Sequence, residues 1–207
     1  MKKIVVLASG EGSNFSAIVE SGIEVSRVIT NNPNANVIKR AKKAGVGSYL
    51  IVPDKPGKAF PANIYRKEYD KQVDYGIYHD IDLIVLAGWM RILSPWFCEK
   101  WAGKIINIHP SLLPAFAGGC NAVEDAYNYG CKVTGCTVHW VTSEVDAGPI
   151  IAQGVHKIFK GTSLERVKED MHLLEHYLYP KTIKEILKMT EERPQIKQVD
   201  KTVARWE

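Results

Sequence analysis

The stretch NIHPSLLP, residues 107–114, contains residue types that can act together on a carbonyl group. Asn107 and His109 are two positions apart, so in an extended strand both side chains point to the same face. Pro110 then ends the strand and leaves both side chains at its carboxyl end. An amide N–H can stabilise a developing oxyanion, and an imidazole can carry protons near neutral pH. A lone histidine is more often structural, but this pair indicates a candidate catalytic site.

A carboxylate partner for His109 could come from the segment SEVDAGP, residues 143–149. If Asp146 folds back onto His109, its negative charge would favour the imidazolium and raise the pKa of the histidine. Acids in loops are usually solvated turn formers, so Asp146 and Glu144 could equally be exposed. The nearby His139 is either a supporting group of this site or an exposed side chain.

The segment SGEGSN, which follows the first apolar run, has the composition of an anion-binding turn. Gly10 and Gly12 free the backbone to curl around an anion, and Ser13 or Asn14 can cap the helix that follows. Phe15 occupies the third glycine position of the dinucleotide fingerprint, so a simple phosphate is favoured over NAD. A tight turn without a ligand is the alternative.

Two further segments carry candidate binding residues. AGWMRILSP, residues 87–95, is either an apolar slot for a flat heterocycle or a helix start with a surface charge at Arg91. HLLEH, residues 172–176, matches a zinc peptidase pattern, and its two histidines share a helix face. A third metal ligand is not evident, so we favour a Glu175 carboxylate that binds an ammonium group, or a solvated helix face, over zinc.

The elements that must position these residues follow an alternating pattern. Short, nearly continuous apolar runs, typical of parallel strands covered on both faces, alternate with amphipathic segments. The predicted strands are 4–8, 25–30, 48–52, 81–87 and 104–108, and the predicted helices are 14–20, 35–44, 63–79 and 95–101. This pattern predicts an α/β fold with an open, mostly parallel twisted sheet flanked by helices. Ligands of such sheets bind beyond the carboxyl ends of the strands, where the candidate residues lie.

After residue 120 the pattern changes. A short helix over 123–129 precedes two β-rich runs, 133–141 and 150–158, which we expect to add an antiparallel pair to the sheet. A long helix over 163–189 follows, capped by Thr162 or Ser163. The tail from residue 191 is polar, with an apolar-containing piece at 202–206. We predict one domain over residues 1–207.

Composition limits the class of protein. The 207 residues carry 27 basic and 23 acidic side chains, a net charge of +4 that indicates at most a mild attraction for anionic small molecules. It gives no argument for nucleic acid. No run is long enough to span a membrane, and the first apolar run is too short for a signal peptide. The four cysteines lack metal or redox spacing, so we expect a cytoplasmic protein with reduced thiols.

Taken together, these segments resemble the folate-dependent phosphoribosylglycinamide formyltransferases of purine biosynthesis. The resemblance covers almost the whole chain and rests on VVLASGEGSN, VLAGWMRILSP, INIHPSLLPAF, VTGCTVHWVTSEVDAGPIIAQ and LLEHYLYP. NIHPSLLP is shared with the wider formyltransferase superfamily, and its combination with GEGSN, MRIL and the length indicates this branch. We expect no room for the further C-terminal domain of a tRNA-directed relative.

The resemblance implies a Rossmann-like formyltransferase fold and transfer of a formyl group from 10-formyltetrahydrofolate to the glycyl amine of glycinamide ribonucleotide, without a metal. It implies small-molecule partners, no nucleic acid and no membrane, and it leaves a homodimer open. The implied catalytic residues are Asn107, His109 and Asp146. The implied ribonucleotide-binding residues are Gly12, Ser13, Asn14 and Glu175. The implied folate-binding residues are Arg66, Met90, Arg91, Ile92, Leu93 and Asn107.

One departure from the family pattern lies after Phe116. Relatives usually continue with proline, glycine and a histidine-containing segment, whereas this chain reads AGGCNA over residues 117–122. The loop lies near the folate in relatives, so the change bears on folate affinity, loop order and the preferred one-carbon donor. It also motivates a competing hypothesis, a non-catalytic phosphometabolite- or folate-binding module. A zinc hydrolase and a formyltetrahydrofolate hydrolase are two more competing hypotheses.

Overall fold

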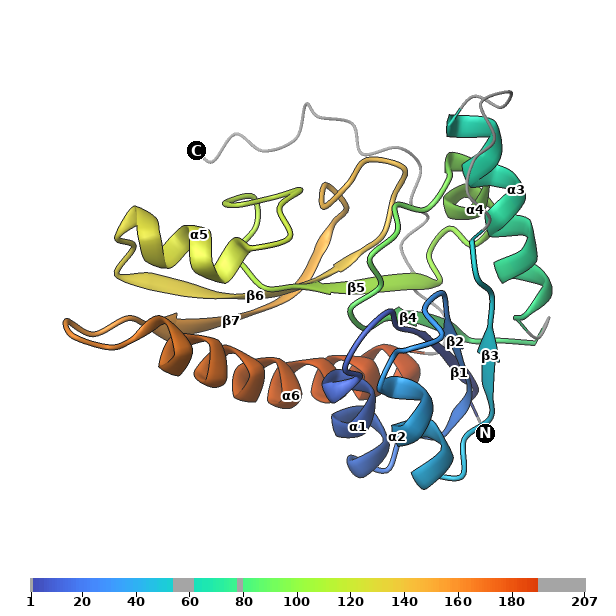
Figure 1. Cartoon of the computed structure of the whole chain (residues 1–207), viewed down its shortest axis with the longest axis horizontal. Helices are drawn as coiled ribbons and strands as arrows, with labels where there is room; N and C mark the ends of the chain where they lie inside the picture. The colour runs from blue at the N-terminus through green and yellow to red at the C-terminus, as the bar shows by residue number, and fades with distance from the viewer. Residues whose placement is uncertain (1, 54–61, 78–79, 190–207) are drawn as a thin grey trace.

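The computed structural model describes residues 2–53, 62–77 and 80–189, and within them it shows alternating strands and helices (Figure 1). The strands are β1 (Ile4–Leu7), β2 (Val25–Thr30), β3 (Ser48–Leu50), β4 (Leu83–Leu86), β5 (Ile105–His109), β6 (Val133–Trp140) and β7 (Ile150–Lys157). The helices are α1 (Ser13–Glu20), α2 (Val37–Lys43), α3 (Ala62–Tyr75), α4 (Pro95–Lys100), α5 (Ala122–Tyr129) and α6 (Leu164–Lys188).

The strands form one seven-stranded sheet in the order β3-β2-β1-β4-β5-β6-β7. The first five strands of the chain pair in parallel, and β6 and β7 extend the sheet through antiparallel pairs. This arrangement confirms the predicted fold class, including the antiparallel addition in the C-terminal part.

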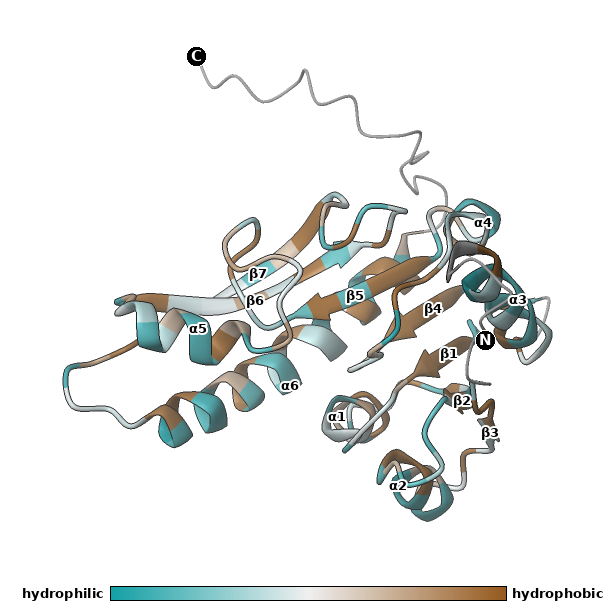
Figure 2. Cartoon of the chain, turned by 45° about the horizontal axis from the view of Figure 1, so that its top comes forward, coloured by the Kyte–Doolittle hydropathy of each residue, from teal (hydrophilic) through white to brown (hydrophobic). Residues whose placement is uncertain are grey.

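Helices cover both faces of the parallel region, which explains its continuous apolar runs. In β1, Ile4 and Val6 pack into a core with α1, α2 and α6, whereas Val5 and Leu7 pack into a second core with α3 and α4. Figure 2 shows the same arrangement, with hydrophobic strands β1, β4 and β5 between the two helical layers. A strand buried on both faces needs an apolar side chain at every position, so strict alternation is lost.

Helix α6 is fixed against the central strands β4 and β5. Its N-cap is Ser163, whose hydroxyl accepts a hydrogen bond from the Arg166 N–H, so the second of the two predicted caps is the correct one. The buried Tyr179 hydroxyl donates to the carbonyl of Leu86 at 2.9 Å and lies 3.3 Å from that of Ile106. Residues four apart share a helix face, so Glu175 also faces the sheet.

Predicted and observed element ends differ by at most four residues, and the predicted strand 25–30 matches at both ends. The largest difference is at the predicted helix 63–79, because α3 ends at Tyr75; the predicted strand 81–87 shortens to Leu83–Leu86, and 48–52 ends at Leu50. Residues 78–79 of one predicted helix and the predicted tail from 191 lie outside the described residues. Among the residues that the structure describes, no helix combines the length and apolar character that crossing a membrane requires.

Candidate active site

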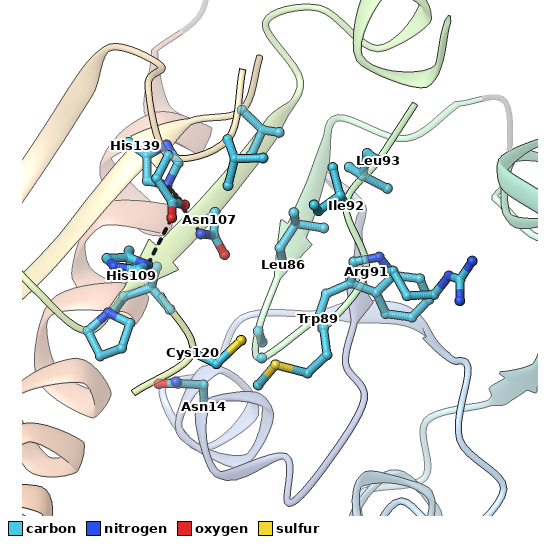
Figure 3. Close-up of a pocket in the computed structure, with 18 of the residues that line it drawn as sticks. Asn14, Leu86, Trp89, Arg91, Ile92, Leu93, Asn107, His109, Cys120 and His139 are labelled. Carbon is cyan, nitrogen blue, oxygen red and sulfur yellow. Dashed lines mark hydrogen bonds and ion pairs between the residues drawn. The ribbon is translucent and has the colours of Figure 1, made fainter. Parts of the chain in front are cut away.

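A cavity of about 530 Å³ opens beyond the carboxyl ends of β1, β4 and β5 (Figure 3). Its walls come from the loops after these strands, the β6–β7 connection and one face of α6. The chain after β1 crosses to β2 on one side of the sheet, and β4 and β5 lie on the other side. The cavity therefore lies at the point where the strand order reverses, which is where open α/β sheets bind ligands.

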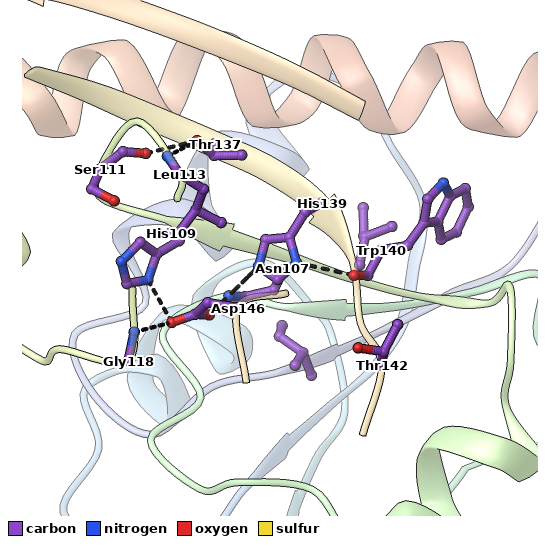
Figure 4. Close-up of polar contacts among 12 residues, drawn as sticks. Asn107, His109, Ser111, Leu113, Gly118, Thr137, His139, Trp140, Thr142 and Asp146 are labelled. Carbon is purple, nitrogen blue, oxygen red and sulfur yellow. Dashed lines mark hydrogen bonds and ion pairs between the residues drawn. The ribbon is translucent and has the colours of Figure 1, made fainter. Parts of the chain in front are cut away.

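Three predicted catalytic residues meet at one end of this cavity (Figure 4). His109 Nδ1 lies 3.4 Å from Asp146 Oδ2, and the same carboxylate oxygen accepts a 2.8 Å hydrogen bond from the Gly118 N–H. His109 Nε2 lies 3.1 Å from the carbonyl oxygen of Phe116. Both nitrogens of the ring therefore face oxygen acceptors, an arrangement that suits a proton on each nitrogen.

His139 adjoins Asn107 and Asp146. The sequence leaves two roles open for it, a supporting group of the site or an exposed side chain. It is 2% exposed, so the expectation of an exposed side chain is wrong. Its Nδ1 lies 3.0 Å from the Trp140 carbonyl oxygen, and Asn107 Nδ2 lies 3.2 Å from its Nε2. Burial lowers the pKa of His139; the hydrogen bond to Trp140 and the charge of Asp146 oppose this shift, and His109 adds to it. The cross-strand pairing of Asn107 with His139 brings the two side chains together.

The glycine-rich turn has a different cap from the predicted one. Gly12, with φ of +72°, is the N-cap of α1, and neither Ser13 nor Asn14 caps the helix. Asn14 does not cap α1 because it already lies inside the first turn, where its Nδ2 donates to Glu175 Oε2 at 2.9 Å. A Cβ on Gly12 would lie 2.6 Å from Val37 Cγ2, so the turn is tightly packed against α2. The first turn of α1 therefore presents backbone N–H groups beside the cavity without a side-chain cap.

Glu175 is a buried carboxyl group that borders the cavity, as the predicted binding of an ammonium group requires. Burial raises its pKa, whereas the hydrogen bond from Asn14 and the charge of His172 oppose the shift. The other amide atom of Asn14, Oδ1, is buried without a hydrogen-bond partner. The rings of His172 and His176 stack with centroids 6.3 Å apart. Within the described ranges, no cluster of three or more potential metal-binding side chains occurs.

The loop after β4 forms an apolar wall of the cavity. Met90 and Ile92 are largely exposed there, and the Met90 N–H donates to Ser9 Oγ at 2.9 Å. The Arg91 guanidinium turns away and lies 4.1 Å from the centre of the Tyr69 ring on α3 (Figure 3). Leu93 also lines the cavity. Arg66, on α3, is not among the lining residues, and its folate contact stays a prediction.

The atypical loop after Phe116 also borders the cavity. Gly118, Gly119 and Cys120 line it, and Gly118 holds the catalytic candidate Asp146 through the hydrogen bond described above. Figure 3 draws Cys120 among the side chains that line the cavity. The sequence places this loop near the site only by resemblance, because its residues carry no catalytic pattern.

Comparison with known proteins identifies relatives over nearly the whole chain. The formyl transferase family model matches residues 2–183. The phosphoribosylglycinamide formyltransferase of Bacillus subtilis is 41% identical over 200 residues, which are 90% of this chain and 95% of that protein. The human trifunctional purine biosynthetic protein adenosine-3 is 38% identical over 86% of this chain but only 18% of its own length. The crystal structure of phosphoribosylglycinamide formyltransferase from Bacillus halodurans is 36% identical, covers 95% of this chain and 100% of its own, and has a TM-score of 0.79.

Proposed function

Because the chain belongs to the formyl transferase family, we propose that it transfers a formyl group from 10-formyltetrahydrofolate to the glycyl amine of glycinamide ribonucleotide in purine biosynthesis. The observation that carries this proposal is the convergence of Asn107, His109 and Asp146 at one end of a cavity. The same cavity has an anion-binding turn on one wall and an apolar loop on another.

The lining of the cavity supports separate positions for the two substrates. The phosphate of the ribonucleotide would bind at the turn of Gly12, Ser13 and Asn14, because the first N–H groups of α1 lack a side-chain cap there. Glu175 would orient the glycyl amine. The folate ring would lie against residues 90–93, where exposed apolar side chains meet backbone polar groups.

The proposed reaction is a direct attack of the neutral amine on the formyl carbon. A new C–N bond forms, and negative charge grows on the formyl oxygen, where an N–H of Asn107 and protonated His109 would stabilise it. The bond between the formyl carbon and the folate nitrogen then breaks. The amine loses a proton and the folate nitrogen gains one, through His109 or water. Neither a covalent enzyme intermediate nor a metal is needed for these steps.

Asp146 would keep His109 in the charged form and in a fixed orientation. Its carboxylate faces Nδ1 of the ring and is itself held by the Gly118 N–H. This leaves Nε2 as the nitrogen that would exchange a proton with the substrates, once it leaves the carbonyl of Phe116. Phe116 and the atypical loop that follows it therefore contact both His109 and Asp146.

The test is release of tetrahydrofolate from 10-formyltetrahydrofolate, which we expect only when glycinamide ribonucleotide is also present. His109→Ala and Asp146→Asn should lower kcat by ~10²–10⁴, the usual contribution of a positioned acid or base. Asn suits position 146 because it tolerates the φ of +52° found there. Glu169→Gln, on the exposed side of α6, is the control. Calorimetry that detects binding of both substrates without turnover would instead indicate a binding module.

The finer expectations on location and assembly also remain proposals. All four cysteines are free thiols, which supports a cytoplasmic protein, and alkylation of the native protein followed by mass spectrometry would count them. A homodimer stays an expectation of the sequence, and light scattering during gel filtration would decide between one and two copies.

A further inference from the structure

The contacts of His139 fix the position of its proton. Its Nδ1 lies 3.0 Å from the carbonyl oxygen of Trp140, and a carbonyl oxygen can only accept, so Nδ1 carries a hydrogen. Its Nε2 lies 3.2 Å from Asn107 Nδ2, which can only donate, so Nε2 offers its lone pair. Together the two contacts describe a neutral imidazole in the Nδ1–H form (Figure 4).

The orientation of the Asn107 amide depends on that proton. While Nε2 is an acceptor, the amide nitrogen faces His139 with one of its two hydrogens, and the second hydrogen stays available to a ligand in the cavity. If His139 gained a second proton, its Nε2–H would face the Asn107 NH₂ group. Two donors repel, so the amide would have to turn over or move away.

We propose that His139 is a positioning residue of the formyl transfer: in its neutral Nδ1–H form it sets which end of the Asn107 amide meets the formyl oxygen. This inference rests on the proposed function, because it assigns to Asn107 the stabilisation of the oxyanion. His139 acts through Asn107 and does not itself touch the substrates.

The surroundings of His139 define what its protonation would change. Asn107 and His109 face it from β5, the Trp140 carbonyl from its own strand, and Asp146 from the β6–β7 connection. Asp146 Oδ1 lies 3.7 Å from His139 Nε2, and Asp146 Oδ2 lies 3.4 Å from His109 Nδ1. A charged His139 would compete with His109 for one carboxylate. Acid would therefore misplace the amide and weaken the Asp146–His109 pair at once.

The direct test reads the proton on the ring and needs no activity. Nitrogen-15 NMR of the labelled full chain at pH 7.5 should show His139 with a hydrogen on Nδ1 and a bare Nε2. A spectrum with the hydrogen on Nε2, or with both nitrogens protonated, would overturn the proposal. This measurement stands apart from the proposed function, which fails separately if the wild type releases no tetrahydrofolate.

The kinetic test compares two replacements of His139. In His139→Gln, the side-chain oxygen can reach the position of Nε2 and accept from Asn107 without a charge, so kcat should stay within about tenfold of the wild type. The acid limb of its kcat profile should lack the ionisation of His139. His139→Leu offers no acceptor and should lower kcat by ~10–100-fold, with KM values nearly unchanged.

His156→Gln is the matched control for the two His139 variants. His156→Gln, on β7 beside Asp170 and outside the cavity lining, should leave both kcat and its pH profile unchanged. If His139→Leu folds and keeps the kcat of the wild type, or if His139→Gln keeps the full acid limb, the proposal is wrong. If His139→Leu does not fold, the glutamine variant and the NMR spectrum still decide.

Discussion

Glu175 and His139 show how single buried residues set the charge of the cavity. Burial penalises the charged form of each, so it raises the pKa of the carboxyl group and lowers that of the imidazole. Each has a polar neighbour that fixes its orientation, Asn14 for Glu175 and Asn107 for His139. Burial thus favours the neutral form of both groups, while the hydrogen bond from Asn14 at Glu175 and the Trp140 carbonyl at His139 oppose that effect.

Glu175→Gln should weaken binding of the ribonucleotide amine without unfolding the protein. Glutamine keeps an oxygen for the Asn14 N–H but loses the charge, so KM for the ribonucleotide should rise by ~10–100-fold, the value of a hydrogen bond to a charged group. The KM for the folate should change little. Steady-state kinetics with each substrate varied in turn would measure this, and an equal rise in both values would contradict the assigned role.

The same substitution should change the pH dependence of stability. The folded-state pKa of Glu175 is raised, so its contribution to stability is present below the unfolded pKa and is lost as pH rises through the folded pKa. Glutamine has no such loss, so Glu175→Gln should gain melting temperature relative to the wild type as pH rises from 4 to 8. Thermal unfolding at several pH values would test the sign, and a relative loss would contradict it.

At the residue scale, local sequence predicts some of these positions and misses others. The placement of Asn107 and His109 is correct because period two and a following proline are local signals. The predicted cap of α1 is wrong because the helix begins one residue earlier than predicted, at Ser13, so that Gly12 takes the cap position. The role of His139 depends on the register between β5 and β6, which no local pattern reveals.

At the scale of elements, the cavity-lining loop after β4 is held by contacts with helix α3. The Ser94 N–H donates to the buried carboxyl group of Asp70 on α3 at 2.5 Å, and Arg91 stacks on the neighbouring Tyr69. These contacts support the loop of residues 90–93 on the side of α3, while Ser9, in the loop after β1, accepts a hydrogen bond from its Met90 N–H. The wall that we propose for folate thus depends on α3, which contributes no lining residue among its described side chains.

Asp70→Ala should weaken folate binding from outside the cavity. It leaves the buried Ser94 N–H without an acceptor, which costs ~1–3 kcal/mol in unfolding free energy. Because the loop of residues 90–93 then loses a support, KM for the folate should rise by a larger factor than kcat falls. Asp70→Asn retains an acceptor and should change both less. Urea unfolding and steady-state kinetics would measure the two effects.

Asp74 gives the matched control for this prediction. It lies one helical turn further along α3 and binds Lys100 and Trp101 of the α4 region, not the loop of residues 90–93. Asp74→Ala should lower stability but leave KM for the folate unchanged. If the two alanine variants raise that KM equally, the effect is a general loosening of α3.

The β6–β7 connection depends on a glycine where two backbones meet. A Cβ on Gly148 would lie 1.8 Å from the carbonyl oxygen of Trp140, the atom that also binds His139. Gly148→Ala should therefore displace both His139 and Asp146, and we expect kcat to fall by at least ~100-fold, with a loss of ~1–3 kcal/mol in stability. Gly47→Ala is the control, because a Cβ there meets nothing within 4 Å. Near-normal kcat in a folded Gly148→Ala would contradict this account.

The order of strands and helices is the part of the fold that the sequence predicts best. The residues at which each strand or helix begins and ends are predicted least well. The switch from continuous apolar runs to the pattern of Val133–Trp140 predicts the antiparallel addition correctly. Boundaries differ because hydrogen bonds between strands decide where pairing stops: β3 ends at Leu50, where its pairing with Thr30 ends.

At the scale of the whole molecule, the cavity joins parts that are far apart along the chain. Its lining runs from Gly10 near the N-terminus to Glu175 on the last described helix. The two cores on opposite faces of the sheet both support it, since α1 and α6 pack in one core and the loop from β4 to α4 packs in the other. We therefore propose that the described residues fold as one cooperative domain.

Thermal unfolding with and without ligands would test that cooperativity. We expect one transition, and saturation with glycinamide ribonucleotide and a folate analogue that carries no formyl group should raise its midpoint. A ligand at 100 times its Kd adds about 2.7 kcal/mol, and for a chain of this size each kcal/mol raises Tm by about 2–4 °C. The midpoint should thus rise by roughly 5–10 °C. Two transitions, of which only one responds to ligand, would mean that the two cores unfold separately, because a cavity built by both cores must stabilise both when it is filled.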